Sequence, residues 1–379
     1  MSGPENIRSL LIIGSGVSAW LPAAMLAARL PRTAWRINVC DLGDTRADTL
    51  LARPYICRAH DLIGIDDAIL SREASARPVH AFAIEAVRGN EAVLPFGDYG
   101  LPFQGAAFNQ YWLRAHRAGK ARPLADYNLA LRLAKAGSFL SKAPNGFPFL
   151  DYGYQLPRQA YGALLRHVAS RAGVNTLSKS VERVELSEAG LIDKVTLGGK
   201  ALSPDLTVCA GSAVLPEADL LLRISQSHNG IHIKAASKLA GLELHQLQTG
   251  TMRLMSLWPG DSFTRSEKAE FDRLYRAETD RIEDMSMLLC DEIGNAAGRS
   301  ALQRKRQVFA ARGRIPTEDY EVFSKSEWLA ALSSCDIIPR QYDRLVDRMS
   351  LEQTIFMVTQ IGNRVDQLVD KHTTTRRTT

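Results

Sequence analysis

The stretch Arg8-Ser-Leu-Leu-Ile-Ile-Gly14-Ser-Gly16-Val-Ser-Ala19-Trp20 decides the fold of this chain. It joins an apolar run to a glycine turn, and an alanine- and leucine-rich run then extends to Leu30. A second apolar run ends in the carboxylate of Asp41. A strand, a glycine turn, a helix and a strand that ends in an acidic residue form a dinucleotide-binding βαβ unit. The sequence therefore predicts a Rossmann-like sheet that starts with residues 8–14.

Each residue type in this unit has a mechanical reason. Gly14 allows the tight turn, and Gly16 lets the backbone approach a pyrophosphate closely. Ala19 stands where a third glycine usually packs the helix on the strand, and the helix N-terminus offers free N–H groups to phosphates. Asp41 is predicted to bind a ribose hydroxyl. The turn alone does not distinguish FAD from NAD, but its place near the start of the chain favours FAD.

The composition is that of an ordinary globular protein. The 379 residues are 45% hydrophobic and 23% charged, and no run of eighteen apolar residues occurs. The first residues, Met-Ser-Gly-Pro-Glu-Asn, lack the basic region of a signal peptide. Five scattered cysteines without a C-x-x-C pair support neither a disulfide framework nor a zinc site. We therefore expect a cytoplasmic protein with no membrane segment and no bound metal.

The net charge of +6 could indicate a protein that binds nucleic acid. Basic residues are scattered, apart from a local cluster at Gln303-Arg-Lys-Arg-Gln. A nucleic-acid reader pairs such a patch with a recognisable module and interleaved aromatic residues, and the sequence has neither. We expect no nucleic-acid partner.

The pattern along the chain predicts an α/β architecture with three parts. Residues 1–219 form the Rossmann-like domain, with an antiparallel β and helical insertion over about 74–150. Residues 220–372 read as almost wholly helical, beginning with a helix over 231–245. Residues 373–379 are predicted to be a disordered polar tail.

Several blocks in fixed order carry a family resemblance. They are Gly14–Trp20, Arg53-Pro-Tyr-Ile, Ile63-Gly-Ile-Asp-Asp67, Leu94-Pro-Phe-Gly97, Phe108-Asn-Gln-Tyr-Trp-Leu113, Tyr152-Gly-Tyr154, Tyr161, Leu164–Gly173, Asp205–Gly211, Gly230-Ile-His-Ile233 and Phe323-Ser-Lys-Ser-Glu-Trp328. Over residues 8 to about 345 the sequence resembles the flavin-dependent tryptophan halogenases, which have FAD monooxygenase-like folds.

The resemblance implies a GR2-type FAD-binding sheet and a flavin reductase as the partner that supplies reduced FAD. In active members of the family, reduced flavin and oxygen generate hypochlorous acid, which reaches a lysine and a glutamate beside an aromatic substrate. The residues that would hold FAD are Gly14, Gly16, Val17, Ser18, Ala19, Asp41, Arg53 and Val181, the last through its backbone against adenine.

The same resemblance shows where this chain departs from the family. Arg77 aligns with the lysine, and an arginine stays protonated and cannot offer a neutral amine. Ser227 aligns with the glutamate, and a serine cannot carry the negative charge of that residue at neutral pH. The candidate catalytic residues are Arg77, at the position of the lysine, and His228, next to the position of the glutamate. The family's central segment after the strand that ends at Gly211, with its W-x-W-x-I-P motif, is absent. The sequence resembles a shortened relative.

Three hypotheses follow. The first is an FAD-binding protein that does not halogenate and acts as a flavin-dependent monooxygenase on an aromatic or tryptophan-containing substrate. The second is a catalytically silent homologue that serves as a binding or assembly module, with a protein partner. The third is an NAD(P)-linked reductase.

Overall fold

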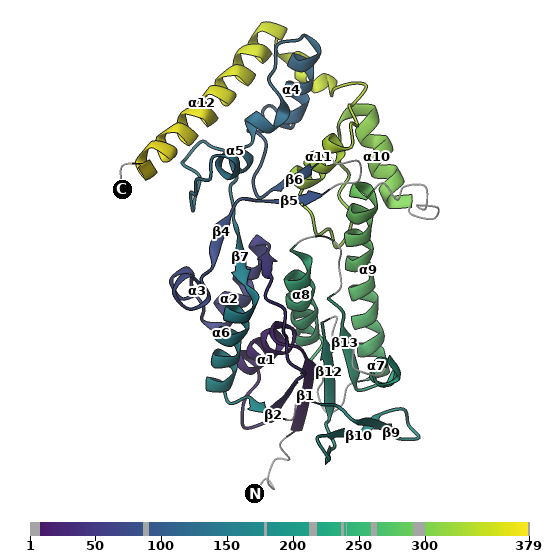
Figure 1. Ribbon diagram of the computed structural model, residues 1–379. Coiled ribbons are helices and arrows are strands. Elements are labelled where there is room, and N and C mark those ends of the chain that lie inside the picture. Colours follow the sequence, from purple (N-terminus) through teal and green to yellow (C-terminus); the bar gives the residue numbers. More distant parts are fainter. Residues whose placement is uncertain are drawn as a thin grey trace, which may run out of the picture. The chain divides into compact units, whose positions relative to one another are not determined.

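The computed structural model describes residues 8–85, 91–177, 180–211, 218–235, 239, 241–258, 264–290 and 300–377, and Figure 1 labels most of their helices and strands. The chain divides into two units. The first comprises Met1–Arg77 and Tyr154–Arg276, and the second comprises Pro78–Gly153 and Ala277–Thr379. The chain passes from one unit to the other within β4 (Arg77–Val79), β7 (Gly153–Pro157) and α9 (Arg265–Leu289).

A five-stranded sheet in the order β13-β12-β1-β2-β8 organises the first unit (Figure 1). Its strands are β1 (Arg8–Gly14), β2 (Trp35–Asp41), β8 (Asn175–Thr176), β12 (Leu206–Ala210) and β13 (Gly230–Ile233). All four neighbouring pairs are parallel. The run Leu10–Ile13 of β1 is buried throughout, as expected for a central strand covered on both faces. The predicted α/β class is confirmed.

The edge strand β13 corrects one prediction. We expected a helix over residues 231–245, but Gly230–Ile233 pairs in parallel with β12, with Ile231 opposite Val208. The helix α8 spans Leu242–Ser256 and begins much later. The prediction was wrong because a short apolar run fits a strand or a helix equally well, and pairing with a neighbouring strand decides between them.

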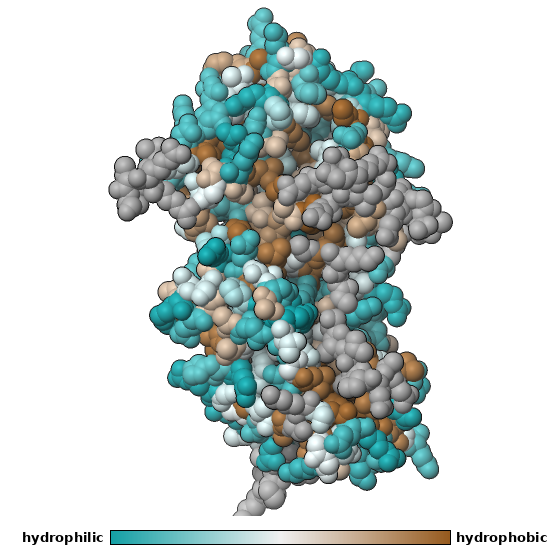
Figure 2. Space-filling view, in the orientation of Figure 1, coloured by the Kyte–Doolittle hydropathy of each residue, from teal (hydrophilic) through white to brown (hydrophobic). Residues whose placement is uncertain are grey.

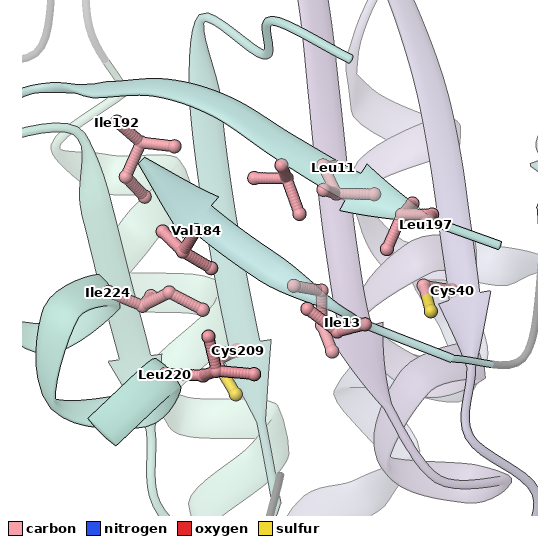
Figure 3. Close-up of a cluster of buried hydrophobic side chains, with 11 residues drawn as sticks. Leu11, Ile13, Cys40, Val184, Ile192, Leu197, Cys209, Leu220 and Ile224 are labelled. Carbon is pink, nitrogen blue, oxygen red and sulfur yellow. The ribbon is translucent and has the colours of Figure 1, made fainter. Parts of the chain in front are cut away.

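Helices and a small sheet cover the two faces of the parallel sheet. Helix α1 (Val17–Arg29) packs on β1 and β2, and also contacts α6 (Arg158–Arg171) and α8. On the other face lies an antiparallel sheet of β9 (Arg183–Leu186), β10 (Ile192–Leu197) and β11 (Lys200–Leu202). Figure 3 shows Leu11 and Ile13 of β1 packed with Val184, Ile192 and Leu197 from this small sheet.

The remaining elements of the first unit lie mostly between β2 and the insertion. They are β3 (Thr49–Ala52), η1 (Pro54–Ile56), α2 (Cys57–Ile63), α3 (Asp67–Ala74) and α7 (Ala218–Gln226). Strand β3 pairs antiparallel with β7, which brings the start of α6 beside the segment that follows β2. This pairing matters for the site described below.

The second unit contains a hairpin and helices. The antiparallel pair β5 (Ala81–Glu85) and β6 (Glu91–Pro95) forms the predicted β insertion. The helical elements are α4 (Phe108–Arg117), η2 (Leu124–Tyr127), α5 (Leu129–Lys135), α10 (Ser300–Arg312), α11 (Lys325–Ser334), η4 (Arg344–Arg348) and α12 (Leu351–Arg377). The helical C-terminal region is thus confirmed. Helix α12 continues to Arg377 through most of the predicted tail, and residues 378–379 lie outside the described part.

Hydrophilic residues cover much of the face shown in Figure 2, in keeping with a chain in which 23% of residues are charged. Among the described helices, none has the length and apolar character needed to cross a membrane.

Candidate functional site

The glycine turn joins β1 to α1 at the carboxyl edge of the parallel sheet. A Cβ added to Gly14 would lie 2.9 Å from the backbone nitrogen of Ala19 and 2.9 Å from the carbonyl oxygen of Ala210. Gly16 caps the helix with a φ of 53°, in the left-handed region. Both glycines are therefore required by the backbone itself, the first by close approach and the second by conformation.

One backbone N–H at the N-terminus of α1 has no acceptor among the described residues. Gly16 provides no side-chain cap, and the first turn of the helix carries no acidic residue. The N–H groups of Ser18 and Ala19 donate within the turn, to Ser15 O at 3.1 Å and Gly16 O at 3.0 Å. The N–H of Val17 has no acceptor within the described part of the chain. A free amide at the positive end of the helix dipole suits a phosphate group.

Asp41 closes the turn from the end of β2. Its Oδ1 accepts from the backbone N–H of Gly16 at 2.9 Å and from that of Gly43 at 3.0 Å. Its Oδ2 accepts from the indole N–H of Trp20 at 2.7 Å. The structure thus brings Gly16 and Asp41 together, as the sequence suggests. Both carboxylate oxygens are engaged by protein donors, so Asp41 orders the turn.

Residues 44–48, the covering segment, lie over this turn. A Cβ added to Gly16 would come within 2.8 Å of Cβ and 3.3 Å of Oδ2 of Asp44. The Asp44 side chain is only 6% exposed. A carboxylate therefore occupies space directly beside the glycine where a diphosphate would approach. Like charges repel strongly at such short range when little water separates them.

An ion pair within the covering segment and a side chain of α6 hold this segment in place. Arg46 donates from Nε to Asp44 Oδ1 at 2.9 Å and from Nη2 to Oδ2 at 2.8 Å. Gln159 on α6 donates from Nε2 to the carbonyl oxygens of Asp44 and Arg46, each at 2.7 Å. Burial raises the pKa of Asp44, but the Arg46 hydrogen bonds and the charge of Arg158 outweigh it, so this pKa lies below its ordinary value. Asp44 is ionised at neutral pH.

Arg158, the first residue of α6, anchors the far end of the covering segment. Its guanidinium is only 3% exposed. It donates to both carboxylate oxygens of Glu243 at 2.8 Å and to Asp48 Oδ2 at 2.9 Å. These bonds hold the pKa of Asp48 below its usual value. Bidentate pairs of this kind are the strong class of ion pair. The covering segment is thus fixed to α6 and, through Glu243, to α8.

The other two residues predicted to contact FAD are both buried. Arg53, 7% exposed, precedes η1. Val181, 6% exposed, belongs to the apolar cluster between the parallel sheet and the small antiparallel sheet. Neither has a contact with the glycine turn among the interactions described above.

The candidate catalytic residues do not join the glycine turn. Arg77 is an exposed residue at the start of β4. Ser227 and His228 precede β13, at the amino edge of the sheet, whereas the turn lies at the carboxyl edge. With a rise of about 3.3 Å per residue, the two edges are roughly 15 Å apart here.

The surroundings of His228 and Ser227 fix both side chains. His228 Nε2 lies 3.1 Å from Arg265 Nη2, and a guanidinium can only donate, so the ring nitrogen accepts. Its backbone N–H donates to Gly190 O at 3.0 Å. Ser227 is fully buried, and its hydroxyl donates to Ile224 O at 2.8 Å. The lone pair that a base needs is therefore already in use at His228.

Sequence reasoning missed the covering segment and its anchors. The run Asp44-Thr-Arg-Ala-Asp48 carries a usable signal, because three charges of mixed sign directly follow the acidic end of β2. Arg158 and Glu243 are distant in sequence from this run, and only the folded chain shows that Arg158 pairs with both Asp48 and Glu243.

We compared the chain with known protein families and with curated proteins. The tryptophan halogenase family profile matches residues 9–221 and 237–351. A search of curated proteins finds no match.

Solved structures of halogenases have the same fold over nearly the whole chain. BrvH, a flavin-dependent halogenase from Brevundimonas sp. BAL3, has a TM-score of 0.86 at 20% identity, covering 97% of each chain. Xcc4156, a flavin-dependent halogenase from Xanthomonas campestris, has a TM-score of 0.83 at 21% identity, covering 98% of each. SttH, a tryptophan 6-halogenase from Streptomyces toxytricini, has 0.77 at 13% identity, covering 96% of this chain and 98% of that one. The likeness to these structures shows a shared fold, and the profile match shows that this chain belongs to the tryptophan halogenase family.

Proposed function

We propose that this chain binds FAD through the glycine turn. The observation that carries the proposal is the combination of Gly14, which has no room for a Cβ, with an uncapped α1 N-terminus. The free N–H of Val17, at the positive end of the α1 dipole, would donate to the diphosphate. Arg53 and Val181 complete the proposed set, with Val181 meeting the adenine through its backbone.

The residues present fit the ADP part of FAD on one condition. Asp44 must leave Gly16, since its carboxylate occupies the approach to the turn. The family membership favours such a rearrangement, because BrvH and Xcc4156, which share this fold, are flavin-dependent halogenases. Bound and reduced flavin would supply the electrons that activate oxygen.

We further propose that the chain does not halogenate. Arg77 would stand in for the family's lysine and, being always protonated, cannot act as a neutral amine. Ser227 would stand in for the glutamate, and its buried hydroxyl already donates to Ile224. The remaining activity would be oxidation of an aromatic or tryptophan-containing substrate, with a flavin reductase supplying reduced FAD.

One observation favours a second candidate, a catalytically silent homologue that acts as a binding or assembly module. Asp44 and its anchors hold the covering segment over the turn through an extended set of ion pairs. If the covering segment never leaves the glycine turn, the chain keeps the fold of the family but FAD cannot reach the turn.

The two candidates are separated by two measurements on the full chain. Equilibrium titration with FAD, followed by flavin fluorescence, tests binding. Oxygen consumption with reduced FAD and candidate aromatic substrates, with mass analysis of the products in chloride and in bromide, tests catalysis. Binding with oxygenated but unhalogenated products supports the main proposal. Binding without turnover, or no binding, supports the silent homologue, and a halogenated product contradicts both.

A further inference from the structure

A separate pocket of about 590 Å³ lies wholly within the second unit. Its wall is formed by residues from the loops 98–107 and 313–315, from the N-terminal parts of α4 and α11, and by Asp343 and Leu345. Ligand sites for small organic molecules typically enclose ~300–1,000 Å³. The pocket therefore has the right size for such a molecule, and nothing in the proposed flavin chemistry uses it.

Apolar side chains and one unpaired hydroxyl line the pocket. Phe108 is 2% exposed and Leu329 is 7% exposed, and both contribute to the wall. Tyr99 also lines it, is 8% exposed, and its hydroxyl has no hydrogen-bond partner among the residues that the structure describes. The hydroxyl oxygen itself is not sealed from solvent, so water can hydrogen-bond to it. A ligand acceptor in the pocket would take the place of that water.

The N-terminus of α4 opens into the same pocket. Ala107 gives the helix no side-chain cap, and the first turn has no acidic residue. Within the described residues the N–H groups of Phe108 and Asn109 make no hydrogen bond. Lys325 lies in the pocket wall, and its ammonium has no ion-pair partner in the described chain. These groups together favour a negative charge at this end.

The other charged groups of the wall are already engaged. Asp343 pairs with Arg314, and Asp98 accepts from the Ser326 hydroxyl at 2.7 Å. The two carboxylates therefore have donors within the protein. Among the described residues, Lys325 and Asp98 are thus the two charged groups of the wall without an ion-pair partner.

We propose that this pocket binds an organic carboxylate with an apolar body. The carboxylate would accept from the N–H groups of Phe108 and Asn109, with Lys325 providing the counter-charge. The apolar body would pack on Leu329 and the Phe108 ring, and the Tyr99 hydroxyl would donate to the ligand. This site is independent of flavin binding, and its test needs no flavin.

The test is calorimetric titration of the full chain, without FAD, using phenylacetate, phenylacetamide and phenylglycine as probes. Phenylacetate is expected to bind at least about tenfold more tightly than the neutral amide, because hydrogen bonds to a charged group are stronger. The Lys325→Gln variant is expected to lose about fivefold in phenylacetate affinity while amide binding stays unchanged. Tyr99→Phe is expected to weaken phenylacetate binding. Lys142→Gln, an exposed lysine outside the pocket, is the matched control.

Three results would overturn the proposal. The first is no saturable binding of phenylacetate to the folded chain. The second is equal binding of acid and amide, or full phenylacetate affinity in Lys325→Gln. The third is tighter binding of phenylglycine than of phenylacetate, since that would assign Asp98 to an ammonium group.

Discussion

The side chain of Asp44 lies against the backbone of Gly16, so closely that a Cβ on Gly16 would come within 2.8 Å of the Asp44 Cβ. Gly16 is the residue through which a turn of this kind receives a diphosphate. The Asp44 carboxylate thus lies directly beside the place where the diphosphate of FAD is proposed to bind. The affinity for FAD should therefore depend on how readily Asp44 leaves.

Replacing Asp44 by asparagine is expected to tighten FAD binding. The change keeps the shape of the side chain but removes the negative charge and weakens its hold on Arg46. An effect of about 1 kcal/mol, or roughly fivefold in Kd, is expected for one short-range charge. Fluorescence titration measures it. Asp193→Asn, an exposed carboxylate on β10, serves as the control and should leave Kd unchanged. Equal or weaker binding by Asp44→Asn would count against this role for Asp44.

Replacing Gly14 by alanine is expected to destabilise the first unit and to weaken FAD binding at least about tenfold. The added Cβ would meet two backbone atoms at 2.9 Å, and backbone cannot move aside cheaply. A loss of about 2 kcal/mol in the free energy of unfolding is expected. Gly162→Ala on α6 is the matched control, since its nearest contact is Val17 Cγ2 at 3.4 Å. That variant should be neutral or slightly more stable, because alanine favours helix. Denaturant unfolding of both variants decides the point.

Replacing Arg158 by glutamine is expected to cost about 2–4 kcal/mol of stability, because it leaves Glu243 with a weakened counter-charge in a half-buried position. Arg183→Gln removes an ion pair of comparable chemistry from an arginine whose side chain is 71% exposed. That control should change stability by less than about 0.5 kcal/mol. Similar losses in the two variants would show that the Arg158 cluster does not anchor the covering segment.

The sequence predicts the glycine turn well because its requirements are local. Gly14, Gly16 and Asp41 lie within one βαβ unit, and the chemistry of each can be argued from its neighbours. Strand β13 could not be predicted in this way, because Gly230–Ile233 becomes a strand only by pairing with β12. The contact of Asp48 with Arg158 joins residues that lie 110 positions apart. A repeating pattern of apolar residues along the chain cannot predict such a long-range ion pair.

His60 should make stability depend on pH. It is buried, its Nε2 lies 2.9 Å from the Tyr161 hydroxyl, and burial lowers its pKa from 6.5 to about 4. The unfolded chain binds this proton more readily, so stability is complete above pH 6.5 and falls as the pH drops towards 4. About 2–3 kcal/mol should be lost between about pH 7.5 and pH 4.5.

Denaturant unfolding at the two pH values measures this loss. The His60→Gln variant removes the titrating group and should show a smaller difference between them. An unchanged difference would assign the pH dependence to other groups, such as His80 and His232, whose pKa values burial also lowers.

The central claim is that FAD binds at the turn formed by Gly14 and Gly16. The most direct measurement is an equilibrium titration of the full chain with FAD, run beside Gly14→Ala and with circular dichroism to confirm that both are folded. We predict saturable binding that weakens at least about tenfold in Gly14→Ala. Equal affinity in the two proteins, or no saturable binding by either the unaltered chain or Asp44→Asn, would contradict the claim.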